Sequence, residues 1–255
     1  MSFELLLASL VLFSGLVALI EKLYLAEKRS QYKTQPIIIE YACSFFPILL
    51  LVFIIRSFII EPFHIPSGSL KPNLLVGDFV LTNKFAYGIR LPVLGTQIIP
   101  IDKPQRGDIV VFRWPGDPKI DYIKRVVGLP GDRISYINKV LYINGQPATQ
   151  IFGKTKIIHN DYDTPITVTK NQENLLGVKH DIYLRSEVPA QDFENLLVPA
   201  GHYFMLGDNR DDSYDSREWG FVPENNLLGK AMLIWFSWNS EKNNVRWDRI
   251  GKRIL

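Results

Sequence analysis

Two long apolar runs at the start of the chain limit its fold more than any other feature. Residues 3–20 are apolar apart from Glu4 and two serines, and a second apolar run covers residues 37–60. Each run is long enough to cross a bilayer as a helix. A cleavable signal peptide fits the first run poorly, because the start MSFE lacks a positive region and no small-x-small cleavage site follows. The other alternative is a pair of helices buried in the core of a soluble protein, but two adjacent apolar runs with a basic loop between them are rare in soluble proteins.

The segment between the two runs, residues 21–35, is polar and basic. It carries Lys22, Lys28, Arg29 and Lys33. By the positive-inside rule we predict that this loop is cytoplasmic, which places the N-terminus and everything after residue 61 on the outer side. Residues 1–60 are therefore predicted to be a membrane anchor of two transmembrane helices.

Beyond residue 61 the pattern changes to short apolar and β-branched runs separated by turn residues. Residues 133–146 have the pattern of a hairpin that turns near Asn138-Lys139, and no amphipathic helix is evident. The other predicted strands are residues 77–87, 107–114, 122–127, 202–206 and 227–238. The predicted fold class is mainly β, with an antiparallel all-β outer domain on a two-helix anchor. We expect residues 61–147 and 199–255 to share one core and the more polar residues 148–198 to form a β-rich inserted subdomain.

Composition and charge argue against several classes of function. The net charge is only +3 and no dense Lys/Arg tract occurs, so no nucleic-acid partner is expected. The single cysteine, Cys43, lies in an apolar run and permits neither an intrachain disulfide nor a cysteine-based metal site. The acidic stretch 207–220 fails the calcium-loop template, because Ser213 and Trp219 occupy its sixth and twelfth positions. We expect no metal and no other cofactor.

One loop has the residues of a nucleophilic site. Ser67-Gly68-Ser69 lies between Pro66 and the pair Lys71-Pro72. Proline biases its neighbours away from helix, so the serines are predicted to lie on an extended, stiff loop. Because Gly68 has no side chain, a substrate can approach the backbone closely at that position. A hydroxyl beside an exposed N–H is what a nucleophilic serine with an oxyanion hole needs. An ordinary Ser/Gly turn has the same composition.

Such a serine needs a general base, and the sequence permits either a histidine or a lysine in that role. His202 with Asp208, or His64, permits a histidine-dependent site, but no G-x-S-x-G motif supports it. Lys124 and Arg125 are adjacent cations in an apolar strand, and alternation sends them to opposite faces without showing which is buried. Only lysine can lose its proton on desolvation, and lowering its pKa from about 10.4 to near neutrality costs roughly 3–4 kcal/mol. A strand-edge lysine that reaches water is the alternative.

Taken together, four stretches resemble the bacterial type I signal peptidases. The matching residues are Pro66-Ser67-Gly68-Ser69 with Pro72 and Gly77-Asp78-Phe79; residues 106–112; residues 122–132; and Gly207-Asp208-Asn209-Arg210 through Ser213, Asp215, Ser216-Arg217 and Trp219-Gly220. They stand in the family's order behind two predicted spans, and the resemblance covers nearly the whole chain.

The resemblance implies a serine endopeptidase with a Ser/Lys dyad. Such an enzyme removes signal peptides from exported preproteins after a small-x-small site such as Ala-x-Ala, through an acyl-enzyme. On this basis Ser69 is the nucleophile and Lys124 the general base. The Ser69 N–H and the Ser67 hydroxyl are implied to form the oxyanion hole, and Ser213 to hold the lysine amine.

The resemblance also implies the surroundings of the dyad. Asp215 and Arg217 are expected to form a structural salt bridge beneath the site. The apolar pockets for small substrate residues are expected to be formed by Phe63, Ile65, Pro66, Tyr122 and Ile123. Walls of this kind reject large side chains sterically. The chain departs from the family pattern at Leu70 and Leu206, where methionine is usual, and these swaps are close in volume.

The implied partners are exported preproteins and the lipid bilayer, and no obligate protein partner is evident. The implied location is the bacterial inner (plasma) membrane, as a multi-pass protein with its catalytic domain on the periplasmic side. A non-enzymatic membrane-anchored β-domain that binds exported chains stays open as an alternative, as does the histidine-dependent hydrolase. A soluble Ser/Lys autoprotease would share the dyad and the β core, but the two spans disfavour it.

Overall fold

The computed structural model describes residues 3–26 and 35–254 of the 255-residue chain. The chain divides into two units. Residues 1–61 and 88–100 belong to the first, and residues 62–87 and 101–255 belong to the second.

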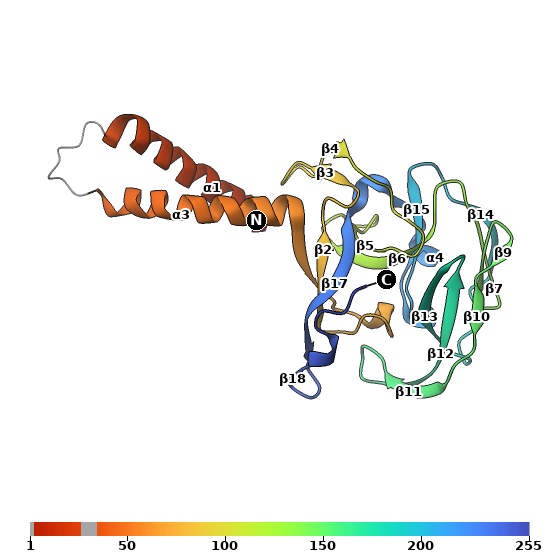
Figure 1. Ribbon diagram of the computed structural model, residues 1–255. Coiled ribbons are helices and arrows are strands. Elements are labelled where there is room, and N and C mark those ends of the chain that lie inside the picture. The colour runs from red at the N-terminus through yellow and green to blue at the C-terminus, as the bar shows by residue number, and fades with distance from the viewer. Residues whose placement is uncertain (1–2, 27–34, 255) are drawn as a thin grey trace. The chain divides into compact units, whose positions relative to one another are not determined.

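The first unit contains the two apolar helices. Helix α1 (Phe3–Ile20) continues into a π-helical turn η1 (Glu21–Leu25), and α3 (Ile37–Ile54) continues into η2 (Ile55–Ile59). The two helices pack along each other (Figure 1). With their turns they are 23 residues long with a mean hydropathy of 2.4, so among the described residues both are long and apolar enough to cross a membrane. Two short strands, β3 (Gly88–Arg90) and β4 (Gln97–Pro100), pair in the same unit.

Large apolar side chains on both helices are open to the surroundings, as expected for helices that face lipid. Leu12 on α1 is 73% exposed and Ile38 on α3 is 74% exposed. The predicted cytoplasmic loop differs at its start, because Glu21–Leu25 prolongs the first helix. The rest of that prediction, with Lys28, Arg29 and Lys33, lies mostly outside the described residues.

Strands are the main regular structure of the second unit. The largest sheet has eight strands in the order β1-β2-β17-β5-β6-β15-β16, with β18 paired to β17 (Figure 1). Its strands are β1 (Ile60–His64), β2 (Asp78–Asn83), β5 (Ile109–Arg113), β6 (Asp121–Gly128), β15 (His202–Leu206), β16 (Val222–Pro223), β17 (Leu227–Asn239) and β18 (Asn244–Val245). This mainly β architecture confirms the predicted fold class.

Two four-stranded sheets complete the second unit. One contains β10 (Thr149–Ile151), β12 (Pro165–Leu175), β11 (Thr155–His159) and β13 (Val178–Leu184). The other contains β14 (Phe193–Leu197), β7 (Arg133–Ile137), β8 (Val140–Ile143) and β9 (Gln146–Pro147). The predicted hairpin is confirmed as β7 and β8, and Asn138 and Lys139 have the positive φ values that a two-residue hairpin turn needs.

Helical turns in the second unit are short. A four-residue helix α4 (Ser216–Trp219) was not anticipated by the sequence, and the Asp215 side chain caps it by accepting the Arg217 N–H. The 3-10 turns are η3 (Gly68–Leu70), η4 (Arg210–Asp212), η5 (Glu224–Asn226) and η6 (Trp247–Arg249).

Strand β6 lies at the centre of the packing, because its side chains enter three different apolar clusters. Ile123 packs with residues of β2 and β5, Val126 packs with Phe112 and Tyr203, and Val127 packs with residues of β7 and β8. Both faces of the strand are therefore covered. This answers the question that alternation left open: Lys124 and Arg125 are both buried, at 5% and 1% exposure.

Asp78 ties the end of the chain to the start of the main sheet. Its fully buried carboxylate accepts hydrogen bonds from Arg249 Nε (2.9 Å), Ser237 Oγ (2.6 Å) and the Leu75 N–H (2.8 Å). A buried ion pair of this kind is costly to break from one side, since the remaining charge stays buried.

We predict that Asp78→Ala lowers the free energy of unfolding by about 3–5 kcal/mol, because Arg249 loses its counter-charge. Denaturant unfolding of the detergent-solubilised chain, followed by tryptophan fluorescence, measures the change. The control is Asp248→Ala, whose side chain is 78% exposed and whose loss should cost less than about 0.5 kcal/mol. Equal effects of the two substitutions would contradict this account of Asp78.

Candidate active site

The loop that carries the predicted nucleophile is extended only at its start. Ser67 has extended backbone (φ −132, ψ 159), and the chain then closes into the 3-10 turn η3, in which Lys71 N–H donates to Gly68 O. The expectation of an extended loop thus fails at Gly68–Leu70. The backbone turns inward here because the Leu70 side chain is fully buried in the apolar cluster beneath the loop. Ser69, one residue earlier, is 7% exposed.

Two distant residues hold the backbone of this turn. The Asn209 N–H donates to Ser69 O (3.0 Å), and its side-chain amide donates to Gly68 O (3.1 Å). On the other side, the Gly68 N–H donates to both oxygens of Asp161, at 2.9 and 2.8 Å. The sequence indicated no such role for either residue. Asp161 is 93 residues away in the chain, and no local pattern marks such a contact.

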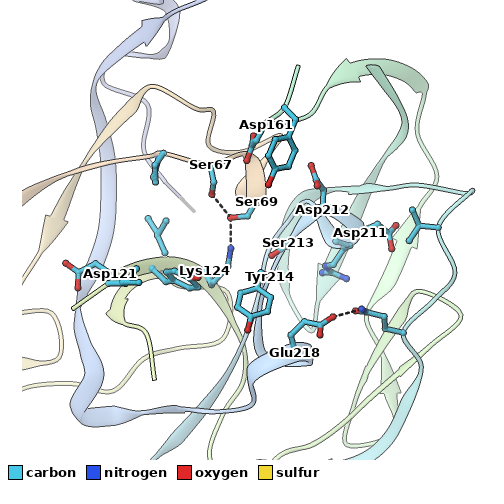
Figure 2. Close-up of a pocket in the computed structure, with 18 of the residues that line it drawn as sticks. Ser67, Ser69, Asp121, Lys124, Asp161, Asp211, Asp212, Ser213, Tyr214 and Glu218 are labelled. Atoms are coloured by element: carbon cyan, nitrogen blue, oxygen red, sulfur yellow. Dashed lines mark hydrogen bonds between the residues drawn. The ribbon is translucent and has the colours of Figure 1, made fainter. Parts of the chain in front are cut away.

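Lys124 meets the serine directly. Its Nζ lies 2.5 Å from Ser69 Oγ, and that oxygen lies 3.3 Å from Ser67 Oγ (Figure 2). Burial is the main cause that lowers the pKa of Lys124 to about 8. Asp215 and Asp208 oppose this shift, and Arg217 adds to it. The amine is therefore poised to exist in its neutral form, which accepts a proton, at mildly alkaline pH.

The buried charge of Arg125 is compensated by an ion pair. Its guanidinium binds the Asp208 carboxylate through two parallel hydrogen bonds of 2.8 and 2.9 Å, and it also donates to Gly107 O. Lys124 has no ion pair of this kind within the described part of the chain. The two neighbouring cations thus differ in chemistry: the arginine is a paired, permanent charge, and the lysine is an unpaired amine whose charge burial disfavours.

The expected ion pair beneath the site is present in the structure. Arg217 Nε and Nη2 each lie 2.9 Å from an oxygen of Asp215. The same carboxylate accepts the Gly207 N–H at 3.0 Å. Through this bond the pair fixes the backbone at the end of β15, next to the serine loop.

Gly207 lies between Ser69 and Ser213, and the space around its Cα is too small for a side chain. A Cβ atom at this position would lie 2.1 Å from Ser213 Oγ and 2.6 Å from Ser69 O. Ser213 lines the same pocket as Lys124, and its buried Oγ has no hydrogen-bond partner among the described residues. The structure thus brings Ser213 to the site but shows no hydrogen bond from it to the lysine amine.

The dyad residues and Ser213 lie on the wall of a cavity of about 600 Å³. Of the predicted pocket residues Phe63, Pro66, Tyr122 and Ile123 line it, together with Ser67, Ser69, Lys124 and Ser213. Ile65 does not, because its side chain is 1% exposed and packs in the core. A further part of the wall was not predicted from the sequence and includes Ile120, Asp161, Tyr162, Val188, Gln191, Tyr214 and Glu218.

No histidine lines this cavity within the described chain. His202 Nδ1 lies 2.9 Å from Ala200 O near the surface, and the His64 ring packs against Phe79 at a tilt of 47°. The geometry gives the histidine-dependent alternative no support.

We predict that Gly207→Ala reduces the specificity constant kcat/KM by about 100-fold or more, because the added methyl displaces the Ser69 carbonyl and the site tolerates little misplacement. Peptide cleavage by the purified variant measures this loss. Its unfolding midpoint shows whether the fold persists. A fully active Gly207→Ala enzyme would contradict the tight fit.

Comparison with known proteins gives the family. Residues 38–238 match the model of the signal peptidase family, peptidase S26. Signal peptidase I of Pseudomonas aeruginosa is 44% identical, over 98% of this chain and 98% of its own length, and that of Pseudomonas fluorescens is 43% identical, over 95% and 94%. A solved signal peptidase I structure from Enterococcus faecalis aligns with 51% of this chain and 97% of its own, at 32% identity and a TM-score of 0.34. Because the family model and the two Pseudomonas enzymes cover most of the sequence, this chain belongs to the signal peptidase family, peptidase S26.

Proposed function

We propose that Ser69 and Lys124 are the nucleophile and general base with which this membrane-anchored serine endopeptidase removes signal peptides from exported preproteins. One observation carries the proposal: the Lys124 amine is buried, has no ion pair among the described residues, and lies 2.5 Å from Ser69 Oγ in a cavity of about 600 Å³. Geometry within hydrogen-bond reach and a pKa near the working pH are the two requirements for such a base.

The chemistry follows from this pair. Neutral Lys124 takes the Ser69 proton as Oγ attacks the scissile carbonyl, and the resulting ammonium gives the proton to the leaving amine of the mature protein. The signal segment then remains as an ester on Ser69. Lys124, neutral again, takes a proton from water as that water attacks the ester, and the signal segment leaves as a carboxylic acid while Ser69 regains its proton.

The developing oxyanion needs donors beside the nucleophile. We assign this role to the Ser69 N–H and the Ser67 hydroxyl, whose oxygen is 3.3 Å from Ser69 Oγ. The backbone geometry supports the first donor, because the N–H groups in the first turn of a helix have no partner within that helix. We propose that Ser213 positions the lysine amine. We propose that the Asp215–Arg217 ion pair positions the backbone at Gly207.

Substrate selection is assigned to the apolar part of the cavity. Phe63, Pro66, Tyr122 and Ile123 wall it with rings and branched carbons beside the dyad. Such walls accept alanine and exclude larger side chains by steric overlap, which suits cleavage after a small-x-small site. Ile65 supports this wall from the core instead of contacting substrate.

The proposed location is the bacterial inner membrane, with the catalytic residues on the periplasmic side. Anchoring serves the reaction because a signal peptide also enters the bilayer, and confinement of both partners raises their effective concentration. We further propose residues 61–147 and 199–255 as the catalytic core with residues 148–198 inserted. Independence from an obligate protein partner stays a prediction.

The dyad is tested by cleavage of a preprotein whose signal ends in Ala-x-Ala. Ser69→Ala and Lys124→Met are each expected to lower kcat/KM by at least about 1,000-fold, since the first removes the nucleophile and the second removes the base at similar volume. His202→Ala is the control and should cut at the wild-type rate. A Lys124→Met enzyme of wild-type activity would refute the assignment, and a wild-type protein that binds the preprotein without cutting it would favour the scaffold function.

The pH profile tests the state of the base. Because only the neutral amine accepts a proton, kcat/KM is expected to rise with pH and to reach half its plateau near pH 8, where Lys124 titrates. Recovery of full activity after incubation at pH 6 controls for unfolding. A half-point below pH 6.5 would point to a histidine or a carboxylate as the base.

A further inference from the structure

The tip of the hairpin formed by β11 and β12, residues 160–164, reaches the loop that carries Ser69. The tip is itself well fixed: Asn160 Oδ1 accepts the N–H groups of Tyr162 (3.0 Å) and Thr164 (2.9 Å), and the Asn160 N–H donates to Thr164 O. Asp161 projects from this turn toward Ser67 and Ser69 (Figure 2). The tip is therefore an ordered support and not a free loop end.

Two residues of the serine loop, Gly68 and Lys71, contact the hairpin. Both carboxylate oxygens of Asp161 lie within 2.9 Å of the Gly68 nitrogen. Lys71, at the other end of η3, donates from Nζ to His159 O (3.0 Å) and lies 3.7 Å from Asp161 Oδ1. The ion pair is partly exposed and contributes little by itself. The charge-assisted bond to the Gly68 N–H is the stronger contact.

The position of that bond matters because a peptide group is planar. The Gly68 N–H lies in the plane that joins Ser67 to Gly68, and the Gly68 carbonyl lies in the next plane, which also contains the Ser69 N–H. Asn209 holds the second plane through the carbonyl. Asp161 holds the first plane, and with it the orientation of the Ser67 Cα from which the hydroxyl projects.

We propose that Asp161 is a positioning residue, which fixes the Ser67–Gly68 peptide plane and thereby keeps the Ser67 hydroxyl beside Ser69 Oγ. This inference rests on the proposed function of Ser67 and Ser69. It assigns to the β11–β12 hairpin a part in the reaction, although no atom of Asp161 reacts.

The glycine between the two serines fits this arrangement. A Cβ atom on Gly68 would lie 2.6 Å from Asp161 Oδ1 and 2.8 Å from Lys71 Cε. A side chain here would push the carboxylate away from the N–H. The loop thus has glycine where the hairpin approaches, in addition to any approach by substrate.

Three variants of the full-length enzyme in detergent test the inference. Asp161→Ala removes the acceptor, and kcat is expected to fall about tenfold or more with KM nearly unchanged. Asp161→Asn keeps one carbonyl oxygen that accepts the Gly68 N–H without charge, so its kcat is expected to lie between that of Asp161→Ala and wild type, at no more than about half the wild-type value. The matched control is Asp163→Asn, which removes the same charge from the same tip, and whose side chain makes no hydrogen bond or ion pair with the serine loop in the described structure. It should have wild-type kcat and KM.

The outcomes separate the possibilities. Unchanged kcat in Asp161→Ala, a loss confined to KM, or an equal loss in Asp163→Asn would each overturn the inference. If Asp161→Ala does not fold, Asp161→Asn decides, and a kcat equal to wild type overturns the inference. Ser69→Ala in the same assay reports on the proposed function alone: if it still cuts, the dyad assignment fails whatever the Asp161 variants do.

Discussion

The burial of Lys124 against Ser69 is the constraint on which the rest of the site depends. A lowering of its pKa from 10.5 to about 8 corresponds to roughly 3 kcal/mol of lost stability when the amine is charged. The fold bears this cost because β6 is packed on both faces, where Ile123, Val126 and Val127 are buried in three apolar clusters. The strand that buries the lysine amine is thus also the strand that joins the three apolar clusters.

Charges close to the lysine are arranged so that they do not restore its proton. A lone carboxylate beside Nζ would stabilise the ammonium, as the separate effects of Asp215 and Asp208 on the pKa of Lys124 indicate. Each of these acids has its own guanidinium, Arg217 for the first and Arg125 for the second. The Asp215–Arg217 ion pair therefore holds the backbone at Gly207, while Arg217 opposes the effect of Asp215 on the pKa of Lys124.

The sequence predicted the mainly β fold and identified Ser69 and Lys124 as candidates, because short motifs and strand alternation are local properties. It left the burial of Arg125 open, since alternation alone does not show that both faces of β6 are covered. It placed Ile65 in the pocket, although the side chain turns into the core. The contact of Asp161 with the serine loop escaped it for another reason: only folding brings together residues 93 positions apart.

Preorganisation of the serine loop comes from hydrogen bonds to its backbone, and this shapes the residues that the loop requires. Donors already aimed at the developing charge need no reorganisation during the reaction. Asp161 and Asn209 bind peptide groups of the serine loop and not its side chains. The side chains next to these peptide groups are therefore limited mainly in size. Glycine is needed at 68 and at 207, where neighbouring atoms approach within the space of a methyl group. Leu70, by contrast, has only to fill the core, so an apolar side chain of similar volume serves there without altering the chemistry.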